Sequence, residues 1–229
     1  MDYRRALIVG AGEGLSASLA RLFARKRLEV ALASRNPDRL APLCAETGAR
    51  AFACEASDAM QVQKLFSAVD ETGQPDVVVY NPSYRVRGPV TGLQPADVEK
   101  ALAVCAFGAF LVAQQAARRM LPGKHGAILL TGASAGVKGY PQSAPFAMGK
   151  FALRGLAQSL ARELSPQGIH VAHFVIDGGI ARPGRAAPSG EPDALLDADA
   201  IAASYYHVLT QPRSAWTWEI ELRPWVEKF

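Results

Sequence analysis

The chain has 229 residues, of which 49% are hydrophobic and 20% charged, and its formal net charge is +4. No apolar run reaches the ~20 residues that span a bilayer, so a membrane protein is not expected. The positive net charge is small and the basic residues form no block, so a nucleic-acid-binding protein is not expected either. The three cysteines are odd in number and lack metal-ligand spacing, which predicts no metal site and a reducing, cytoplasmic location.

Short runs of β-forming residues alternate with helical patterns along the whole chain. Strands are predicted at 5–10, 28–34, 50–54, 76–80, 126–131, 169–175 and 216–222. Helices are predicted at 14–26, 37–47, 58–72, 95–120, 143–165 and 193–210. The runs at 77–80 and 127–130 are apolar throughout, as in strands buried on both faces. The alternation predicts a single domain over residues 1–229, an α/β doubly wound parallel sheet (Rossmann fold) of about seven strands with helices on both faces.

The first predicted strand leads into a glycine-rich turn, Gly10-Ala11-Gly12-Glu13-Gly14, and then into a helix that begins near Leu15. Glycine permits positive φ and a close approach between backbone and ligand. Such a turn and the N-terminus of the following helix direct backbone N–H groups at one point, which suits a phosphate. The sequence therefore predicts a dinucleotide site that includes Gly10, Gly12, Glu13, Gly14 and Leu15.

The end of the second predicted strand indicates which dinucleotide binds. NAD-binding turns are usually followed there by an acidic residue that holds the ribose 2′-hydroxyl. This chain has Ser34-Arg35-Asn36 instead, and Arg35 can pair with a 2′-phosphate. We therefore expect these three residues to bind NADP. Glu13 lies close to the expected phosphate, where it either pairs with Arg35 or weakens the preference, so NAD remains an alternative.

Further segments have a recognisable order and spacing. Residues 10–16 form the glycine turn, with Ser16 as its last residue, and they are followed by Cys54–Asp58, Tyr80–Ser83 and Asp177–Ile180. Together with the segments 126–141, 150–156 and 163–171, they resemble the short-chain dehydrogenase/reductase family over nearly the whole chain. The resemblance implies cofactor contacts beyond the glycine turn, from Glu55, Ala56, Asn81, Pro82, Ser83, Lys150, Gly178 and Ile180.

The resemblance also implies a catalytic set of Asn, Ser and a Tyr-x-x-x-Lys pair, from which this chain departs. Phe146 takes the place of the tyrosine, while Lys150 is kept four residues later. Ala133 stands where the serine is often found, with Ser134 next to it, and Cys105 stands where the asparagine is expected. In the family the tyrosine is the general acid/base, and the lysine lowers its pKa and holds the ribose. Phenylalanine has no proton to give, and loss of a positioned general acid costs about 10²–10⁴ in rate.

Several of the remaining candidate residues have two interpretations. Lys150 and Ser134 are the predicted catalytic residues, although Lys150 could instead be a solvated helix lysine and Ser134 could cap a turn. Phe146, Tyr140 and Tyr84 are predicted to line the substrate site. Either tyrosine could replace the missing hydroxyl, or be an amphipathic surface aromatic. His173 lies in a buried strand, where a satisfied core histidine is expected.

Three functions are compatible with these residues. The first is an NADP(H)-dependent oxidoreductase acting on a small carbonyl/alcohol pair or an activated double bond, with a non-standard active site. The second is a catalytically impaired NADP-binding sensor or partner subunit. The third is a serine hydrolase, because residues 132–136 spell Gly-x-Ser-x-Gly around Ser134, and Asp177 and His207 follow. That motif must lead directly into a helix, whereas 137–145 contains two prolines.

Partners other than a small-molecule substrate follow only from the resemblance. The predicted helices 95–120 and 143–165 carry small residues that would allow close packing. Family members commonly pair these helices, so the resemblance implies a homo-oligomer, a dimer or a tetramer.

Overall fold

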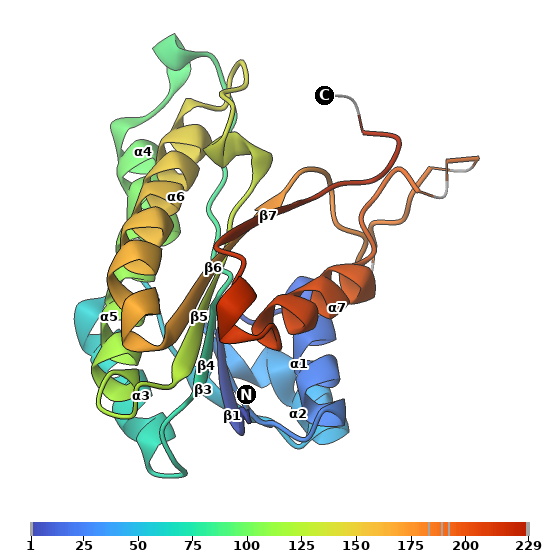
Figure 1. The fold of residues 1–229 in the computed structure, drawn as a ribbon. Helices are drawn as coiled ribbons and strands as arrows, with labels where there is room; N and C mark the ends of the chain where they lie inside the picture. The colour runs from blue at the N-terminus through green and yellow to red at the C-terminus, as the bar shows by residue number, and fades with distance from the viewer. Residues whose placement is uncertain (1, 183, 189, 192, 228–229) are drawn as a thin grey trace.

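Parallel strands form the centre of the molecule (Figure 1), in a computed structural model that describes residues 2–182, 184–188, 190–191 and 193–227. The sheet has seven strands in the order β3-β2-β1-β4-β5-β6-β7. They are β1 (Arg5–Val9), β2 (Glu29–Ser34), β3 (Arg50–Ala53), β4 (Val77–Tyr80), β5 (Gly126–Thr131), β6 (Ile169–Ile176) and β7 (Glu219–Leu222). The order reverses between β1 and β4, where a doubly wound sheet leaves a crevice for a ligand.

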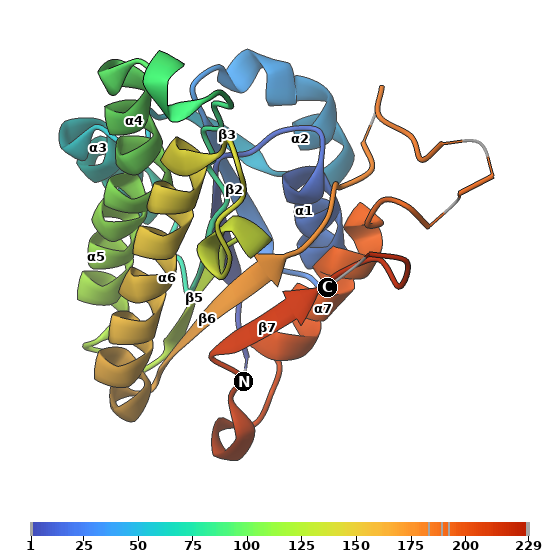
Figure 2. The ribbon, with the colours of Figure 1, turned by 90° about the horizontal axis from the view of Figure 1, so that it is seen from above.

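Helices cover both faces of the sheet (Figures 1 and 2). One face carries α1 (Leu15–Arg25), α2 (Ala41–Thr47) and α7 (Ala198–Leu209); the other carries α3 (Ala59–Asp70), α4 (Pro95–Leu102), α5 (Gly108–Met120) and α6 (Ala144–Leu164). The predicted fold class is confirmed. Among the described residues, no helix combines the length and apolar character that crossing a membrane would require.

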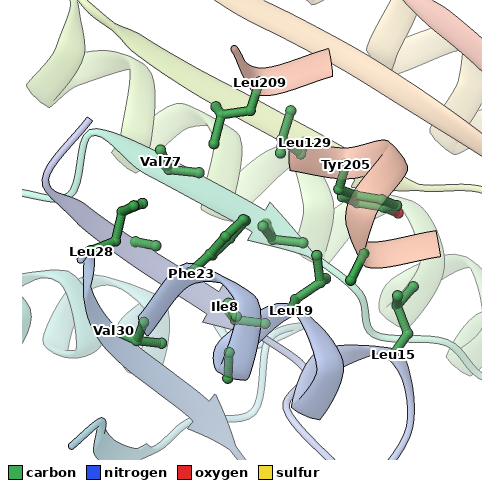
Figure 3. Close-up of a cluster of buried hydrophobic side chains, with 14 of the residues drawn as sticks. Ile8, Leu15, Leu19, Phe23, Leu28, Val30, Val77, Leu129, Tyr205 and Leu209 are labelled. Atoms are coloured by element: carbon green, nitrogen blue, oxygen red, sulfur yellow. The ribbon is translucent and has the colours of Figure 1, made fainter. Parts of the chain in front are cut away.

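The core on the α1 and α7 side fixes these helices against the strands (Figure 3). Phe23 and Leu19 of α1 pack with Ile8 of β1, and all three are fully buried. Tyr205 of α7 stacks on Phe174 of β6, with ring centroids 3.5 Å apart. Full burial of such side chains contributes about 1.5–3 kcal/mol each. This packing holds the carboxyl ends of the central strands rigidly in place.

Two of the predicted helices are not continuous. Residues 37–47 form a 3₁₀ turn (Pro37–Leu40) followed by α2, because Pro42 in the first turn of α2 has no N–H to donate. The predicted helix 95–120 is divided into α4 and α5 by a π segment, Ala103–Phe107. The Tyr80 hydroxyl donates to the Val104 carbonyl at 2.5 Å within this segment. The side chain of a central strand thus holds the widened turn.

The last two predicted elements begin later than expected. The predicted helix 193–210 begins only at Ala198, where the Asp197 carboxylate caps the Ala200 N–H at 2.7 Å. Just before it, Leu196 bonds to Gly179 and Ala181 and so cannot be helical. The predicted strand 216–222 begins only at Glu219, because the backbone groups of Thr217 are bonded to the side chains of His170 and Gln211 instead of to the backbone of β6.

Candidate functional site

The glycine turn lies at the reversal of strand order. Gly10 has φ +81°, and a Cβ there would lie 2.6 Å from the backbone nitrogen of Pro82, which follows β4. Glycine is therefore required at this position, because any side chain would push the ends of β1 and β4 apart. Predicted site residues Gly10 and Pro82 are thus in direct contact at the carboxyl edge of the sheet.

The rest of the turn has the form of an anion cradle. Built Cβ atoms on Gly12 and Gly14 meet nothing within 4 Å, so the backbone is open to a ligand. Within the described residues, the N–H groups of Gly12, Glu13 and Gly14 donate no backbone hydrogen bond. They precede the N-terminus of α1, whose dipole favours negative charge. Leu15, the first residue of α1, is buried and anchors the helix to the core.

Ser16, in place of the third glycine, has a structural role that the sequence did not predict. Its hydroxyl donates to the Gly10 carbonyl at 3.0 Å and accepts from the Asn81 amide at 2.7 Å. The Asn81 side chain, predicted to contact the cofactor, thus braces the glycine turn. Ser83, two residues further on, is exposed.

The end of β2 carries the groups that would meet the adenosine end of a dinucleotide. Ser34 Oγ is buried, and no partner for it is found in the described part of the chain. Arg35 and Asn36 are exposed, and the described residues include no ion pair between Arg35 and Glu13. The Asn36 side chain makes no cap hydrogen bond to the 3₁₀ turn that follows it. An orphaned hydroxyl beside an unpaired guanidinium fits a polar, anionic ligand.

A hollow of about 600 Å³ adjoins Gly12 and Glu13, and its lining carries both arginines and acidic residues. Arg39 and Arg185 are among the residues that line it. Arg39 lies in the 3₁₀ turn after β2, four residues beyond Arg35, and was not predicted as a site residue.

Beyond β3, the adenine-side segment is held in place by its own hydrogen bonds. The Glu55 carboxylate accepts from the Ser57 hydroxyl at 2.9 Å, and the Glu55 N–H donates to Gln61 at 2.9 Å. The Ala56 carbonyl lies so close to Gly108 that a Cβ at Gly108 would be 2.7 Å from it. Glu55 and Ala56 therefore hold a fixed position between β3 and α5.

Lys150 on α6 is a deeply buried charged side chain near the carboxyl ends of the strands, at 2% exposed. Its ammonium donates to the Thr131 carbonyl at the end of β5, at 2.8 Å. Burial lowers the pKa of Lys150, and Cys105 opposes that shift. Phe146, one turn earlier, is 8% exposed, and the Lys150 ammonium lies 5.8 Å from its ring centroid.

The hydroxyl groups predicted near the site have different surroundings. Ser134 opens a 3₁₀ turn (Ser134–Gly136) near the end of β5, and its hydroxyl has no hydrogen-bond partner among the described residues. The Tyr84 hydroxyl donates to Asp97 at 2.8 Å, and this bond raises its pKa. Tyr140 is 39% exposed, with the Lys138 ammonium 5.6 Å from its ring centroid. Tyr84 is thus committed to α4 and Tyr140 is hydrogen-bonded to Lys138, whereas Ser134 remains available.

The segment after β6 closes the site from the other side. Gly178 has φ +148°, and a Cβ there would lie 2.9 Å from Pro224. Ile180 forms an isolated parallel bridge with Leu196. These contacts fix the path of the chain across the carboxyl edge, beside the Lys150 region.

Comparison with known proteins identifies the family of this chain. The family profile described as short chain dehydrogenase matches residues 4–184. The chain belongs to the short-chain dehydrogenase family. It is an oxidoreductase of that type, as the names of its relatives indicate.

Relatives within the short-chain dehydrogenase family share both sequence and fold with this chain. D-threitol dehydrogenase from Mycolicibacterium smegmatis is 30% identical over 177 residues, covering 75% of this chain and 68% of the relative. A short-chain dehydrogenase structure from Rhodopseudomonas palustris is 33% identical, with a TM-score of 0.85, covering 98% of this chain and all of the other. The X-ray structure of an alcohol dehydrogenase from Thermococcus sibiricus, complexed with 5-hydroxy-NADP, has a TM-score of 0.87 at 22% identity, covering 99% of each chain.

The alternative of a serine hydrolase is wrong. After Ser134 the chain makes a 3₁₀ turn, and the helix begins only at Ala144, so the strand-to-helix elbow of that chemistry is not formed. His207 is exposed on α7. The Asp177 carboxylate lies 3.4 Å from the Lys138 ammonium, so it forms an ion pair with a cation and not with a histidine.

One polar cluster next to the short-chain dehydrogenase site was missed in the sequence. His173 is a core residue as expected, but it is not fully satisfied: Nδ1 lies 3.0 Å from Glu219 Oε2, and Nε2 is buried with no partner in the described residues. Arg154 holds the same carboxylate with two hydrogen bonds, of 2.7 and 2.8 Å. The only signal was the spacing of Lys150 and Arg154, four residues apart on one helix face.

Proposed function

We propose that this chain is an NADP(H)-dependent oxidoreductase acting on a small carbonyl/alcohol pair or an activated double bond, with Phe146 at the position of the usual tyrosine. The observation that carries the proposal is the buried ammonium of Lys150, held at the end of β5 beside an open glycine turn. Burying a cation without a carboxylate partner lowers the stability of the fold. Binding of a polar ligand would explain why this chain has a lysine at the position.

The chain's own residues support NADP. The open N–H groups of Gly12 to Gly14 would hold the pyrophosphate, and the orphaned Ser34 hydroxyl with Arg35 would hold the 2′-phosphate. Arg39 strengthens that preference, because a second guanidinium favours the extra charge of NADP over NAD. The archaeal enzyme with the same fold is complexed with 5-hydroxy-NADP.

The proposed roles follow from the positions of the side chains. When bound, the nicotinamide would supply or accept the hydride. Lys150 would orient the ribose through the N–H groups that Thr131 leaves free, and its lowered pKa makes its proton easier to release. Ser134 would donate to the substrate oxygen. Phe146 and Tyr140 would line the substrate site and exclude water, with Tyr84 at its edge.

A binding assay and a turnover assay test the proposal separately. We expect NADPH to bind more tightly than NADH, and Lys150→Met to abolish binding, measured by quenching of tryptophan fluorescence. Turnover is then measured with NADPH and a panel of ketones, aldehydes and enones. If neither nucleotide binds to the wild-type protein, the proposal is wrong at its first step.

A second candidate, an NADP-binding sensor or partner subunit without catalysis, is supported by Phe146 itself. Its ring is flanked by two cations, with the Arg85 guanidinium 5.2 Å and the Lys150 ammonium 5.8 Å from its centroid. NADPH binding without turnover on any member of the panel would favour this candidate. Phe146→Tyr would then raise turnover by about 10²–10⁴ if the proton donor is all that is missing.

Self-association completes the proposal. Apolar side chains lie exposed along the π segment, α5 and α6: Phe107, Phe110, Met148 and Phe151. Their solvent exposure supports a homo-oligomer, a dimer or a tetramer. The thiols Cys44, Cys54 and Cys105 are free, which supports a reducing compartment such as the cytoplasm. Light scattering on the purified chain measures the oligomeric state.

A further inference from the structure

His173 and Lys150 are buried on the same side of the sheet, on either side of one peptide segment. On β6, the side chains of Val171 and His173 face α6, and His173 is in register with Glu219 on β7. On β5, Thr131 receives Lys150 at its carbonyl, and the next residue, Gly132, faces His173. A Cβ on Gly132 would lie 2.2 Å from His173 Nε2, so the imidazole occupies the space that glycine leaves open.

The hydrogen bonds of Glu219 decide which ring nitrogen carries the proton. Arg154 binds both carboxylate oxygens, and this pairing, with His173 assisting, lowers the pKa of Glu219 and keeps it ionised. An ionised carboxylate only accepts, so the Nδ1 of His173 donates to it. In the neutral ring, Nε2 is then an acceptor. It is a buried acceptor that no donor meets within the described residues.

The Lys150 ammonium, held at the carbonyl of the neighbouring residue Thr131, makes no direct hydrogen bond to Nε2 among the described residues, so a water is needed to join the two groups. The ammonium has three N–H groups, of which one is used by Thr131. The positive charges of Lys150 and Arg154 both act on His173, and with burial they lower its pKa, while Glu219 opposes them. From β5, no titratable side chain faces the ring, because Gly132 has none. Cys105, in the π segment, faces Lys150.

We propose that His173 is a positioning residue for Lys150, and that Lys150, His173 and Glu219 form a proton path between the buried amine and solvent. The proposal rests on the function proposed above. In alcohol oxidation, an Nζ–H bond of the Lys150 ammonium first breaks as Nε2–H forms through one water, which leaves a neutral amine. The substrate then gives its hydride to the cofactor and its hydroxyl proton to that amine. The Nδ1 proton leaves to Glu219, whose side chain is 18% exposed, and from there to water. Reduction runs the same path in reverse.

The path gives the active site a substitute for the lost tyrosine hydroxyl. Without Tyr at position 146, Lys150 is the buried group that must exchange a proton, and a buried amine cannot do so rapidly without a relay. His173 suits that task because an imidazole can accept at one nitrogen while it releases at the other. The carboxylate that orients it is fixed by Arg154, on the helix face that also carries Lys150.

A matched pair of variants tests the proposal. His173→Gln keeps a polar atom near Nε2 but cannot relay a proton. His170→Gln is the control, because His170 is on the same strand, is equally buried and also bonds through one nitrogen, to the Thr217 carbonyl at 2.9 Å, but has no link to Lys150. We expect His173→Gln to lower kcat by about 10²-fold and to remove one ionisation from its pH profile. We expect His170→Gln to leave kcat within about twofold.

Nuclear magnetic resonance of the protein without cofactor provides a readout that does not need turnover. Long-range ¹H–¹⁵N spectra should show the Nδ1–H tautomer for His173, and the ¹⁵N shift of Lys150 Nζ should titrate at a different pH in His173→Gln. Glu219→Gln, which leaves the ring in place, should bring up the Nε2–H tautomer. It serves as the second variant if His173→Gln does not fold.

The outcomes separate the two proposals. The proton path is overturned, whatever the activity, if the His173 tautomer is unchanged in Glu219→Gln and the Lys150 titration is unchanged in His173→Gln. If His173→Gln retains wild-type kcat and pH profile, it is overturned as well. If the wild-type protein shows no turnover but the Lys150 titration depends on His173, the coupling stands while the proposed oxidoreductase function fails.

Discussion

Replacing Lys150 by methionine should stabilise the fold while it removes cofactor binding. The side chain is 2% exposed, and its ammonium has one hydrogen bond, to the Thr131 carbonyl, among the described residues. Burying a charge costs several kcal/mol, and one hydrogen bond to a charged group returns about 1.5–3 kcal/mol. Methionine fills similar space without charge, so we expect a gain of about 1–3 kcal/mol. For a chain of this size that is about 2–12 °C in Tm.

The same variant should change how stability depends on pH. Burial lowers the pKa of Lys150 below its ordinary value of 10.5. Between the folded pKa and 10.5, the unfolded chain holds more protons than the folded chain, so the wild-type protein gains stability as pH rises through this window. Below the window both states are protonated, and the full cost of burial remains. Lys150→Met should lack this slope.

Thermal unfolding followed by circular dichroism, near neutral pH and near the top of that window, measures both effects. Lys64→Met is the control, because Lys64 is exposed on α3 and its replacement should change stability by less than about 0.5 kcal/mol. The reasoning is refuted if Lys150→Met unfolds at or below the wild-type temperature while the control is unchanged. Lys150 would then have a compensating partner that the described contacts do not include.

Three substitutions in the glycine turn should separate folding from binding. Gly10→Ala should cost about 2–4 kcal/mol in urea unfolding, since it combines positive φ with a contact of 2.6 Å to Pro82. Gly12→Ala meets nothing within 4 Å, so it should leave urea unfolding unchanged but weaken NADPH binding in a fluorescence titration; equal loss of both would contradict an open cradle. Ser16→Ala removes the hydroxyl between Gly10 and Asn81, and should lower stability by about 1–3 kcal/mol in the same urea assay; no change would show that the brace is unimportant.

The sequence predicted the fold well because the fold depends on local patterns. Continuous apolar runs such as 77–80 are strands buried on both faces, and they lie in the centre of the sheet. The late starts of α7 and β7 were not predictable in this way. Leu196 pairs with a segment about 15 residues earlier, and Thr217 with His170. Such pairings depend on tertiary contacts, which override local propensity.

In the candidate site, too, residues in short local motifs were predicted, whereas residues joined by tertiary contacts were not. Gly10 to Gly14 and Lys150 were predicted because each belongs to a short segment whose spacing carries its meaning. The His173 cluster was not, because Glu219 is 46 residues away in sequence and becomes its neighbour only through the register of β6 with β7. Asn81 was predicted to hold a cofactor, but its partner Ser16 is 65 residues away.

The α6 face shows how Phe146 fits the shape of the proposed site. Phe146, Lys150 and Arg154 follow at intervals of four and so lie near one face of the helix. The phenyl ring fills the volume of a tyrosine ring and lacks only the hydroxyl, so Lys150 keeps its bond to Thr131. Under the proposed function, the missing hydroxyl is the proton donor that the family resemblance implies at this position. His173 occupies the space that Gly132 leaves open, next to the residue whose carbonyl holds Lys150. Under the proposed function, substitutions in the glycine turn should therefore alter cofactor binding, and substitutions around His173 should alter proton transfer.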